Sequence, residues 1–259
     1  MIPTPDTLRQ AGFTGLRVVG DVHGDARGFD AALAGAEASR LFVIQLGDLT
    51  DHGPDNPAVL RAMFAAIDEG RGLFILGNHD HKLRRALGGQ FVRMERDGLG
   101  RTLDQIAAAP DAAALTARAI AEIGRAPAWL SLGRLMFVHA AFHDAMLEHP
   151  SPPDAGAARP EGLVGRAIFG QVTGRRAADG FPIRLTGWVD RIPPWLTVLV
   201  GHDNRSRDGR PVTMTGQRGG RAIFLDTGAG KGGALAWQDF SLAETGVDAP
   251  QGRTPSVTV

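Results

Sequence analysis

The sequence of 259 residues predicts an α/β domain, because short apolar runs alternate with stretches that have helical spacing. The apolar runs are rich in β-branched and aromatic side chains, which is typical of buried strands. A chain of this length builds one large domain or two small ones, and the continuous alternation favours one. The predicted strands are residues 16–19, 41–46, 73–76, 135–138 and 196–200.

Helices are predicted between these strands. Residues 27–39 have helical spacing, and Asn56 followed by Pro57 predicts a helix start, with a capping side chain and then proline in the first turn. Gly70 should end that helix. A short helix is expected after Asp80.

The rest of the chain is expected to be more irregular. Residues 99–126 are Ala-rich and helical but interrupted at Pro110, and residues 149–160 should form a surface loop. The single domain is predicted to cover residues 1–240, and residues 241–259 are small, polar and predicted to be a loosely ordered tail.

Polar side chains follow each predicted strand directly. In α/β sheets the carboxyl ends of the strands form the functional crevice, so these side chains should meet. A glycine stands between strand and polar group at Gly20, Gly47, Gly77 and Gly201, where it permits a sharp turn. The polar side chains are Asp21, His23, Asp48, Asn78, His79, His139 and His202.

Composition limits the classes of protein. Lys plus Arg equals Asp plus Glu at 28 each, so the overall charge gives no reason to expect a nucleic-acid coat. There is no cysteine, which excludes disulfides and zinc–thiolate sites. No apolar run is long enough to cross a bilayer and the first 17 residues lack signal-peptide features, so we expect a cytoplasmic protein without a membrane partner.

Carboxylate, imidazole and amide groups in this arrangement predict a site for two divalent metal ions. Asp48 is the natural bridge between the ions. Asp21 and His23 would complete the first metal, and the second would be completed by Asn78, His139 and His202. Two such ions sit about 3.5–4 Å apart and supply hydroxide near neutral pH for attack on phosphorus.

A general acid is predicted next to the metal ligands. His79 would protonate the leaving oxygen, and Asp80 or another carboxylate would orient its imidazole. The alternative is that His79 only binds phosphate. Asp226 could orient a ligand, or it could be only a turn residue before Gly228.

The same segments carry a family resemblance. Residues 20–24 (Gly-Asp-Val-His-Gly), 47–53 (Gly-Asp-Leu-Thr-Asp-His-Gly) and 77–80 (Gly-Asn-His-Asp) resemble the motifs of calcineurin-like metallophosphoesterases. The match extends through residues 138–140, 200–202 and 225–228. Within the phosphoprotein-phosphatase branch, the chain is most similar to the phosphatase domain of bacterial polynucleotide kinase-phosphatase, over roughly residues 17–240.

The resemblance implies a four-layer α/β/β/α sandwich of two mixed sheets with helical cap insertions, here residues 88–127 and 143–195. Manganese is the first choice of metal, with iron, zinc or nickel as alternatives. The resemblance also implies that Asn78 and Arg85 contact the substrate phosphate, although Arg84 and Arg85 could both be ordinary surface charges on a helix.

The chain departs from the family pattern in the second motif. His52 stands where the family has an arginine that clamps phosphate, and an imidazole cannot copy a permanently charged fork. His52 is therefore a substrate contact of reduced strength, or it indicates a different substrate. Asn204 stands where many superfamily members have a second histidine, and the phosphoprotein-phosphatase branch lacks that histidine too.

A second phosphate-binding motif is excluded. Residues 228–232 (Gly-Ala-Gly-Lys-Gly) superficially resemble a P-loop, but Leu225 and Gly232 stand where a glycine and a hydroxyl residue are required. Kinase activity is therefore not expected.

The sequence predicts a metal-dependent phosphoesterase that hydrolyses phosphomonoesters, with His79 as general acid. The alternatives are a dinucleoside polyphosphate hydrolase, a phosphodiesterase, or a binding module of the same fold without turnover. The phosphorylated partner could be a protein, a nucleotide or a nucleic-acid end, and the sequence leaves the oligomeric state open.

Overall fold

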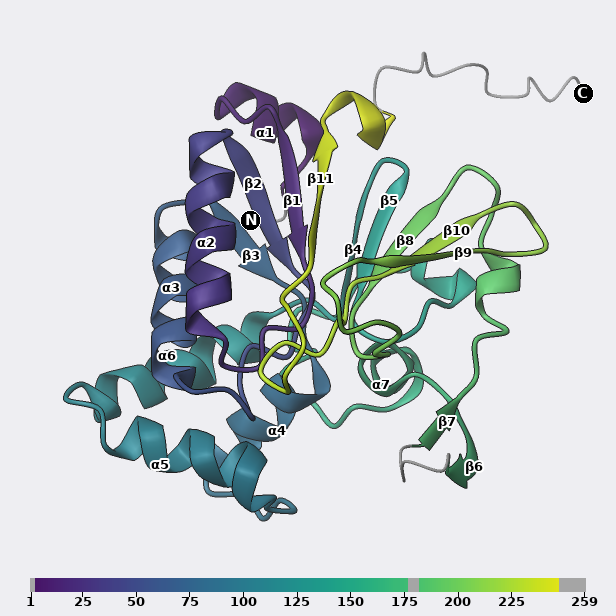
Figure 1. Ribbon diagram of the computed structural model, residues 1–259. Coiled ribbons are helices and arrows are strands. Elements are labelled where there is room, and N and C mark those ends of the chain that lie inside the picture. The colour runs from purple at the N-terminus through teal and green to yellow at the C-terminus, as the bar shows by residue number, and fades with distance from the viewer. Residues whose placement is uncertain (1–2, 177–181, 247–259) are drawn as a thin grey trace, which may run out of the picture.

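Two β-sheets form the centre of the protein in a computed structural model that describes residues 3–176 and 182–246 (Figure 1). The first sheet has the strand order β11-β1-β2-β3 and the second has the order β4-β5-β8-β10-β9. The first comprises β1 (Gly15–Val19), β2 (Leu41–Gln45), β3 (Gly72–Phe74) and β11 (Trp237–Ser241). The second comprises β4 (Trp129–Leu132), β5 (Leu135–Val138), β8 (Thr197–Val200), β9 (Val212–Thr215) and β10 (Arg221–Phe224).

Both sheets are mixed. In the first, β1, β2 and β3 run parallel and β11 pairs antiparallel with β1. In the second, β5, β8 and β10 run parallel, while β4 and β9 are antiparallel edge strands. The chain therefore has two sets of three parallel strands, and the carboxyl ends of each set can carry functional side chains.

The two sheets pack face to face, as the alternation of side chains shows. Leu16 and Val18 of β1 share one buried cluster with Phe137 of β5 and Leu199 of β8. The neighbouring side chains on these strands point outward into a second cluster that contains the helices. Burial on both faces of both sheets explains why the strands read as nearly continuous apolar runs.

Helices cover the outer faces. Helices α2 (Ala26–Ala38) and α3 (Asn56–Asp68) lie along the first sheet (Figure 1). On the outer side of the second sheet, Trp188 packs against Phe224 with ring centroids 5.9 Å apart, beside Ile168 of α7 (Gly162–Phe169). The order helix, sheet, sheet, helix confirms the predicted four-layer sandwich of two mixed sheets.

The remaining elements connect these layers. Helices α5 (Arg101–Ala107) and α6 (Ala112–Arg125) pack with α3, and α4 (Asn78–Leu87) packs with α6; α5 lies at the lower left of Figure 1, and the β6–β7 pair projects at the lower right. No helix within residues 3–176 and 182–246 is long and apolar enough to cross a bilayer. Further elements are α1 (Pro5–Gln10), β6 (Val172–Arg176), β7 (Pro182–Arg184) and the single turns Arg96–Gly100, Asp144–Met146, Val189–Arg191 and Ala243–Thr245.

The structure corrects two local predictions. Asp55, not Asn56, caps α3: its side chain accepts from the backbone N–H of Ala58. Asn56 is fully buried, and its Oδ1 accepts from the backbone N–H of Asp51 at 2.8 Å. Asp and Asn are equally good capping residues, so the adjacent pair Asp55–Asn56 does not itself show which of them is the cap.

The second correction concerns the predicted tail. Strand β11 ends at Ser241, and buried Leu242 donates its N–H to the carbonyl of Thr14. The turn Ala243–Thr245 then places the carbonyl of Thr245 2.7 Å from the backbone nitrogen of Arg134. The boundary at residue 240 therefore falls inside ordered structure, and residues 247–259 of the predicted tail lie outside the described residues.

Candidate metal centre

The polar residues predicted to meet do lie together, because each follows one of the parallel strands. Strands β1 and β2 lead to Asp21, His23 and Asp48, while β3 leads to Asn78 at the start of α4. In the second sheet, β5 leads to His139 and β8 leads to His202. The carboxyl ends of the two sets of parallel strands thus supply one site from both sheets.

Asp48 is at the middle of this site. It is 2 % exposed, and its Oδ1 accepts from the backbone N–H of His79 at 2.9 Å. The Nε2 atom of His139 lies 3.4 Å from Asp48 Oδ1, and the Nε2 atom of His23 lies 3.7 Å from Asp48 Oδ2. One carboxylate therefore faces imidazoles from both sheets, as a bridging ligand must.

Two overlapping groups of donor atoms share Asp48. Asp21, His23 and Asp48 form one group, and Asp48, His139 and His202 form the other, with the ligand atoms of each group within 4.8 Å of one another. Asn78 adds its Oδ1 to the second group at 3.1 Å from His139 Nε2. These are the two ligand sets that the sequence predicts, and mixed carboxylate, imidazole and amide donors suit first-row divalent ions.

Backbone hydrogen bonds orient two of the imidazoles for this purpose. His23 Nδ1 lies 2.9 Å from the carbonyl oxygen of Thr50, and His139 Nδ1 lies 2.7 Å from that of Leu46. A carbonyl only accepts, so each ring donates through Nδ1, and Nε2, which is directed at the carboxylates, is the atom that can ligate a cation once it is unprotonated. The donor set therefore fits two cations.

Electrostatics also indicate a place for positive charge. Burial works against the charged form of His139, but the carboxylate of Asp48 outweighs it and raises the pKa of His139 to about 9. Burial and the nearby Asp226 carboxyl raise the pKa of Asp21 well above its usual range. Buried carboxylates that draw protons onto themselves and onto an imidazole are equally suited to draw a metal cation.

The backbone at the site is held in unusual conformations. Five of its non-glycine residues have positive φ, between 47° and 80°: His23, Asp48, Asp51, His52 and His202. Such conformations cost on the order of 1–3 kcal/mol each and concentrate at functional sites. The turns that aim the side chains are therefore made largely by the ligands themselves.

Of the four glycines before the ligands, Gly47 has the conformation of the predicted sharp turn and the others serve a different purpose. Among Gly20, Gly47, Gly77 and Gly201, only Gly47 has positive φ. A Cβ on Gly201 would lie 2.0 Å from Asp21 Oδ1, and one on Gly77 would lie 2.3 Å from Asp48 Oδ1. These glycines make room for the carboxylates, so close approach rather than a sharp turn requires them.

The carboxylate on the His79 imidazole is Asp51, not Asp80. Fully buried Asp51 places its Oδ2 2.5 Å from His79 Nδ1, and its Oδ1 accepts from the hydroxyl of Thr102 at 2.7 Å. Burial works against the charged form of His79, but the carboxylates of Asp48 and Asp51 outweigh it and raise the pKa of the imidazole. His79 thus has an oriented ring and a stabilised proton.

Asp80 instead holds the backbone of the site together. Its two carboxylate oxygens accept from the N–H groups of Gly77, Asp48 and Leu49 at 2.8–3.0 Å. Asp80 is the third residue of α4, so its side chain points back toward the start of the helix and away from the neighbouring histidine.

Of the predicted substrate contacts, Asn78 and His52 lie among the clustered polar side chains, whereas Arg85 bonds to residues that follow α4. The His52 ring packs against His23 and His79 at centroid distances of 5.2 and 5.6 Å. Burial, together with Lys231 and His79, lowers the pKa of His52 to about 4. Arg85 donates to the Gln90 side chain at 3.0 Å and to the backbone oxygen of Phe91 at 3.3 Å, and its role as a phosphate contact stays a prediction.

Asp226 lies behind the first ligand group. It is 4 % exposed, follows β10, and accepts from the backbone N–H of Gly228 at 2.9 Å. Its charge is one of the influences that raise the pKa of Asp21. Its hydrogen bond to Gly228 fixes a turn, and its role in orienting a ligand stays a prediction.

Sequence reasoning missed two cations at the site. Lys231 Nζ lies 2.8 Å from His23 Nε2, and the Arg184 guanidinium contacts His202 Nε2. Lys231 belongs to the glycine-rich segment 228–232, which does not match a P-loop. Arg184 is the last residue of β7 and lies within a predicted cap insertion. The sequence offers one signal for Lys231: lysine is rare in this chain, because only two of the 28 Lys and Arg residues are lysines.

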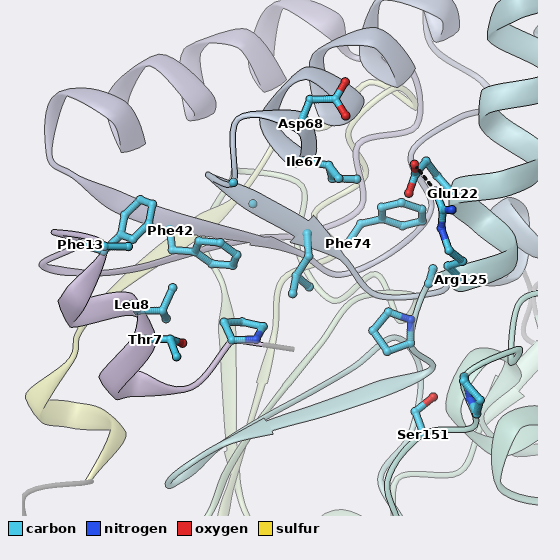
Figure 2. Close-up of a pocket in the computed structure, with 18 of the residues that line it drawn as sticks. Thr7, Leu8, Phe13, Phe42, Ile67, Asp68, Phe74, Glu122, Arg125 and Ser151 are labelled. Atoms are coloured by element: carbon cyan, nitrogen blue, oxygen red, sulfur yellow. Dashed lines mark hydrogen bonds and ion pairs between the residues drawn. The ribbon is translucent and has the colours of Figure 1, made fainter. Parts of the chain in front are cut away.

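A separate groove of about 1070 Å³ lies at the edge of the first sheet (Figure 2). It is lined by Leu8 of α1, Phe42, Phe74 and the ion-paired side chains of Glu122 and Arg125. None of the lining residues that the structure describes is one of the predicted site residues, so this groove is separate from the candidate metal centre.

Comparisons with known proteins agree with the predicted family. The family model of calcineurin-like phosphoesterases matches residues 16–141. An asymmetrical bis(5′-nucleosyl)-tetraphosphatase PrpE of Bacillus subtilis is 29 % identical over 215 residues, covering 81 % of this chain and 79 % of the relative. The corresponding protein of Geobacillus thermodenitrificans is 28 % identical over 241 residues, covering 84 % and 87 %.

Solved structures share the fold at lower identity. A putative diadenosine tetraphosphatase superposes with a TM-score of 0.53 at 22 % identity, covering 88 % of this chain and 89 % of that one. A protein serine/threonine phosphatase from Saccharomyces cerevisiae gives a TM-score of 0.54 at 12 % identity, covering 88 % and 80 %.

Proposed function

We propose that this chain, a hydrolase acting on phosphoester bonds, is a calcineurin-like phosphoesterase whose main reaction is cleavage of the phosphoanhydride bonds of dinucleoside polyphosphates with two divalent metal ions. The observation that carries the proposal is the pair of ligand groups joined by Asp48. The names of the PrpE relatives, which align with more than three quarters of this chain, point to the substrate class.

Each ion has its own proposed set of ligands. Asp21, His23 and Asp48 would hold one ion, and Asp48, Asn78, His139 and His202 would hold the other. Two ions bound there supply positive charge that offsets the phosphate oxygens and lowers the pKa of water. Manganese remains our first choice, with iron, zinc and nickel as the alternatives, because all of them accept this donor set.

The remaining chemistry belongs to His79 and Asp51. His79 Nε2 lies on the Asp48 side of the ring, 4.0 Å from Asp48 Oδ2, and can reach the leaving oxygen of a substrate bound over the carboxylate. Asp51 holds the proton on Nδ1 and so keeps the imidazole in the cationic form that a general acid requires. Asp51 is a positioning residue in this scheme.

The two predicted cap insertions are proposed as walls of the substrate site. The first, residues 88–127, brings Gly98 to the histidines: a Cβ built there would lie 3.4 Å from His52 Cε1. The second, residues 143–195, brings Arg184 to His202. Contacts from both insertions at opposite ends of the centre support this division of the domain.

Hydrolysis of phosphomonoesters is a second candidate. The hydrogen bond between His79 and Asp51 favours it, because a general acid contributes most when the leaving group is a poorly stabilised alkoxide. The likeness to the phosphatase domain of bacterial polynucleotide kinase-phosphatase stays a prediction. A 3′-phosphorylated RNA is the substrate that would test it.

A substrate panel tests these proposals. Manganese-loaded enzyme is given diadenosine tetraphosphate, p-nitrophenyl phosphate, 3′-phosphorylated RNA and a phosphopeptide, with chelated enzyme as the blank. We expect the highest kcat/KM for diadenosine tetraphosphate. Chromatography then separates asymmetrical cleavage to ATP and AMP from symmetrical cleavage to two ADP.

The panel also contains the results that contradict the proposal. Faster turnover of a monoester than of diadenosine tetraphosphate would move the assignment to the second candidate. Unchanged turnover after chelation would contradict the assignment of a catalytic metal centre.

A further inference from the structure

We propose that Lys231 is the cation that binds the substrate's phosphate on the His23 side of the centre, and that it does so in exchange for its contact with His23. The inference rests on the proposed function only in requiring a metal-loaded centre that binds phosphate. It assigns a role to a loop that neither the sequence motifs nor the comparisons assign.

The first observation is the position of the ammonium group. Lys231 Nζ donates to His23 Nε2 at 2.8 Å, while the residue as a whole is exposed. The lysine stem therefore runs over the surface and its tip reaches a histidine that is only 1 % exposed. Because the stem of Lys231 is exposed, the position of its ammonium group is set by the backbone that carries it and not by packing of the side chain.

The second observation is the loop that carries the lysine. Gly228, Gly230 and Gly232 all have positive φ, and a Cβ on Gly230 would lie 2.2 Å from the backbone oxygen of His23. The N–H groups of Lys231 and Gly233 both bond to the carbonyl of Gly228, at 3.0 and 2.9 Å. The loop is a closed turn pressed against the His23 backbone, so Lys231 stays at this side of the centre.

The third observation is that the hydrogen bond uses the atom needed for a metal. His23 Nδ1 is already turned to the carbonyl of Thr50, so Nε2 provides the free lone pair. That lone pair accepts from Lys231 or ligates an ion, but not both at once. A bound cation therefore releases Lys231 and repels it, and an anion placed between the two positive charges relieves the repulsion.

The fourth observation is the lack of a permanent charge at position 52. His52 is an imidazole, and the nearby Arg101 donates to the backbone oxygen of His52 and pairs with Asp97 instead of facing the centre. Arg184 lies at the other side, on His202. A tethered lysine is a good point charge for a phosphate oxygen, although it does not form the two-pronged contact of arginine.

The exchange predicts opposite effects on two ligands when the lysine is neutralised. In Lys231→Met, Mn²⁺ should bind about 2- to 10-fold more tightly, because His23 no longer has a competing donor. Inorganic phosphate should inhibit the manganese-loaded enzyme about 10-fold or more weakly, because a charge-assisted hydrogen bond is lost. Isothermal titration of the metal-free full chain with Mn²⁺ measures the first effect without any turnover.

Three further variants complete the experiment. Lys82→Met removes the other lysine, which pairs with Glu95 at 2.9 Å outside the centre, and should leave both affinities unchanged. Lys231→Arg should keep phosphate inhibition within a few-fold. In the Lys231→Met background, His52→Arg should restore phosphate inhibition, because it returns a permanent charge to the same side of the centre.

The results separate this inference from the proposed function. Unchanged phosphate inhibition in Lys231→Met, or weaker Mn²⁺ binding, overturns the role of the lysine whatever the substrate is. Failure to cleave diadenosine tetraphosphate overturns only the substrate assignment, since both readouts use inorganic ligands. Thermal unfolding of each variant checks that the exposed side chain has been changed without loss of the fold.

Discussion

Replacing Asp51 by asparagine tests the general-acid chemistry at the residue that orients the His79 imidazole. The substitution keeps the shape of the side chain but removes the negative charge 2.5 Å from His79 Nδ1. The amide oxygen of asparagine can still accept from Nδ1, but it carries no negative charge, so the imidazolium form of His79 loses its charged partner. Asp51 is fully buried and holds Thr102 as well, so water does not replace the lost interaction.

The size of the effect follows from the kind of interaction. A hydrogen bond to a charged group contributes about 1.5–3 kcal/mol, and each 1.36 kcal/mol is a factor of ten in rate. If the bond is needed only when His79 gives up its proton, kcat/KM should fall about 10- to 150-fold for a poor leaving group. For p-nitrophenyl phosphate the fall should be several-fold smaller, since p-nitrophenolate needs little protonation.

The pH profile gives an independent reading. The Asp48 and Asp51 carboxylates outweigh burial and raise the pKa of His79, so the protonated acid persists to higher pH in the native enzyme. Removing Asp51 lowers that pKa, and the descending limb of kcat/KM should move to lower pH.

The assay compares kcat/KM for phenyl phosphate and p-nitrophenyl phosphate between about pH 5 and 10, with Thr102→Val as the control that leaves the Asp51 charge in place. Equal losses for both esters, together with an unmoved descending limb, would refute the pairing of Asp51 with a catalytic His79.

Three further substitutions test the other roles. Asp48→Asn should abolish metal-dependent hydrolysis of p-nitrophenyl phosphate, measured with added manganese, and a rate near that of the native enzyme would exclude the bridging role. Asp80→Asn should lower the free energy of unfolding by about 1–3 kcal/mol in urea titrations and reduce turnover of both esters alike, because it breaks backbone hydrogen bonds. His52→Arg should lower KM for a phosphomonoester more than it changes kcat, and an unaltered or higher KM would contradict a phosphate contact at that position.

The strands and the ligands behind them could be predicted because both depend on local sequence. A strand buried on both faces is a nearly continuous apolar run, as β2 is apart from Gln45 and β8 is apart from Thr197. The rim of a parallel sheet then brings distant ligands together with no further information. Antiparallel edge strands gave no such signal: β9 alternates between intermediate and exposed positions, and β11 has a single buried residue.

The orienting carboxylate of His79 could not be read from the sequence, since proximity along the chain favours the wrong residue. Asp80 follows His79 directly, but neighbouring side chains on a helix point about 100° apart. Asp51 is 28 residues away and reaches the ring only through a turn in which Asp51 and His52 both have positive φ. Non-glycine residues rarely adopt that conformation, so no propensity argument anticipates it.

Lys231 shows the same limit, because residues 228–232 do not match a phosphate-binding motif and yet the lysine reaches the centre. A P-loop needs a defined spacing to wrap one phosphate with backbone N–H groups, and residues 228–232 lack that spacing. The glycines here serve instead to press the loop, which follows β10 of the second sheet, against His23, which follows β1 of the first sheet. Sheet order is a property of the whole chain, so a loop can approach a phosphate site without a phosphate-binding motif.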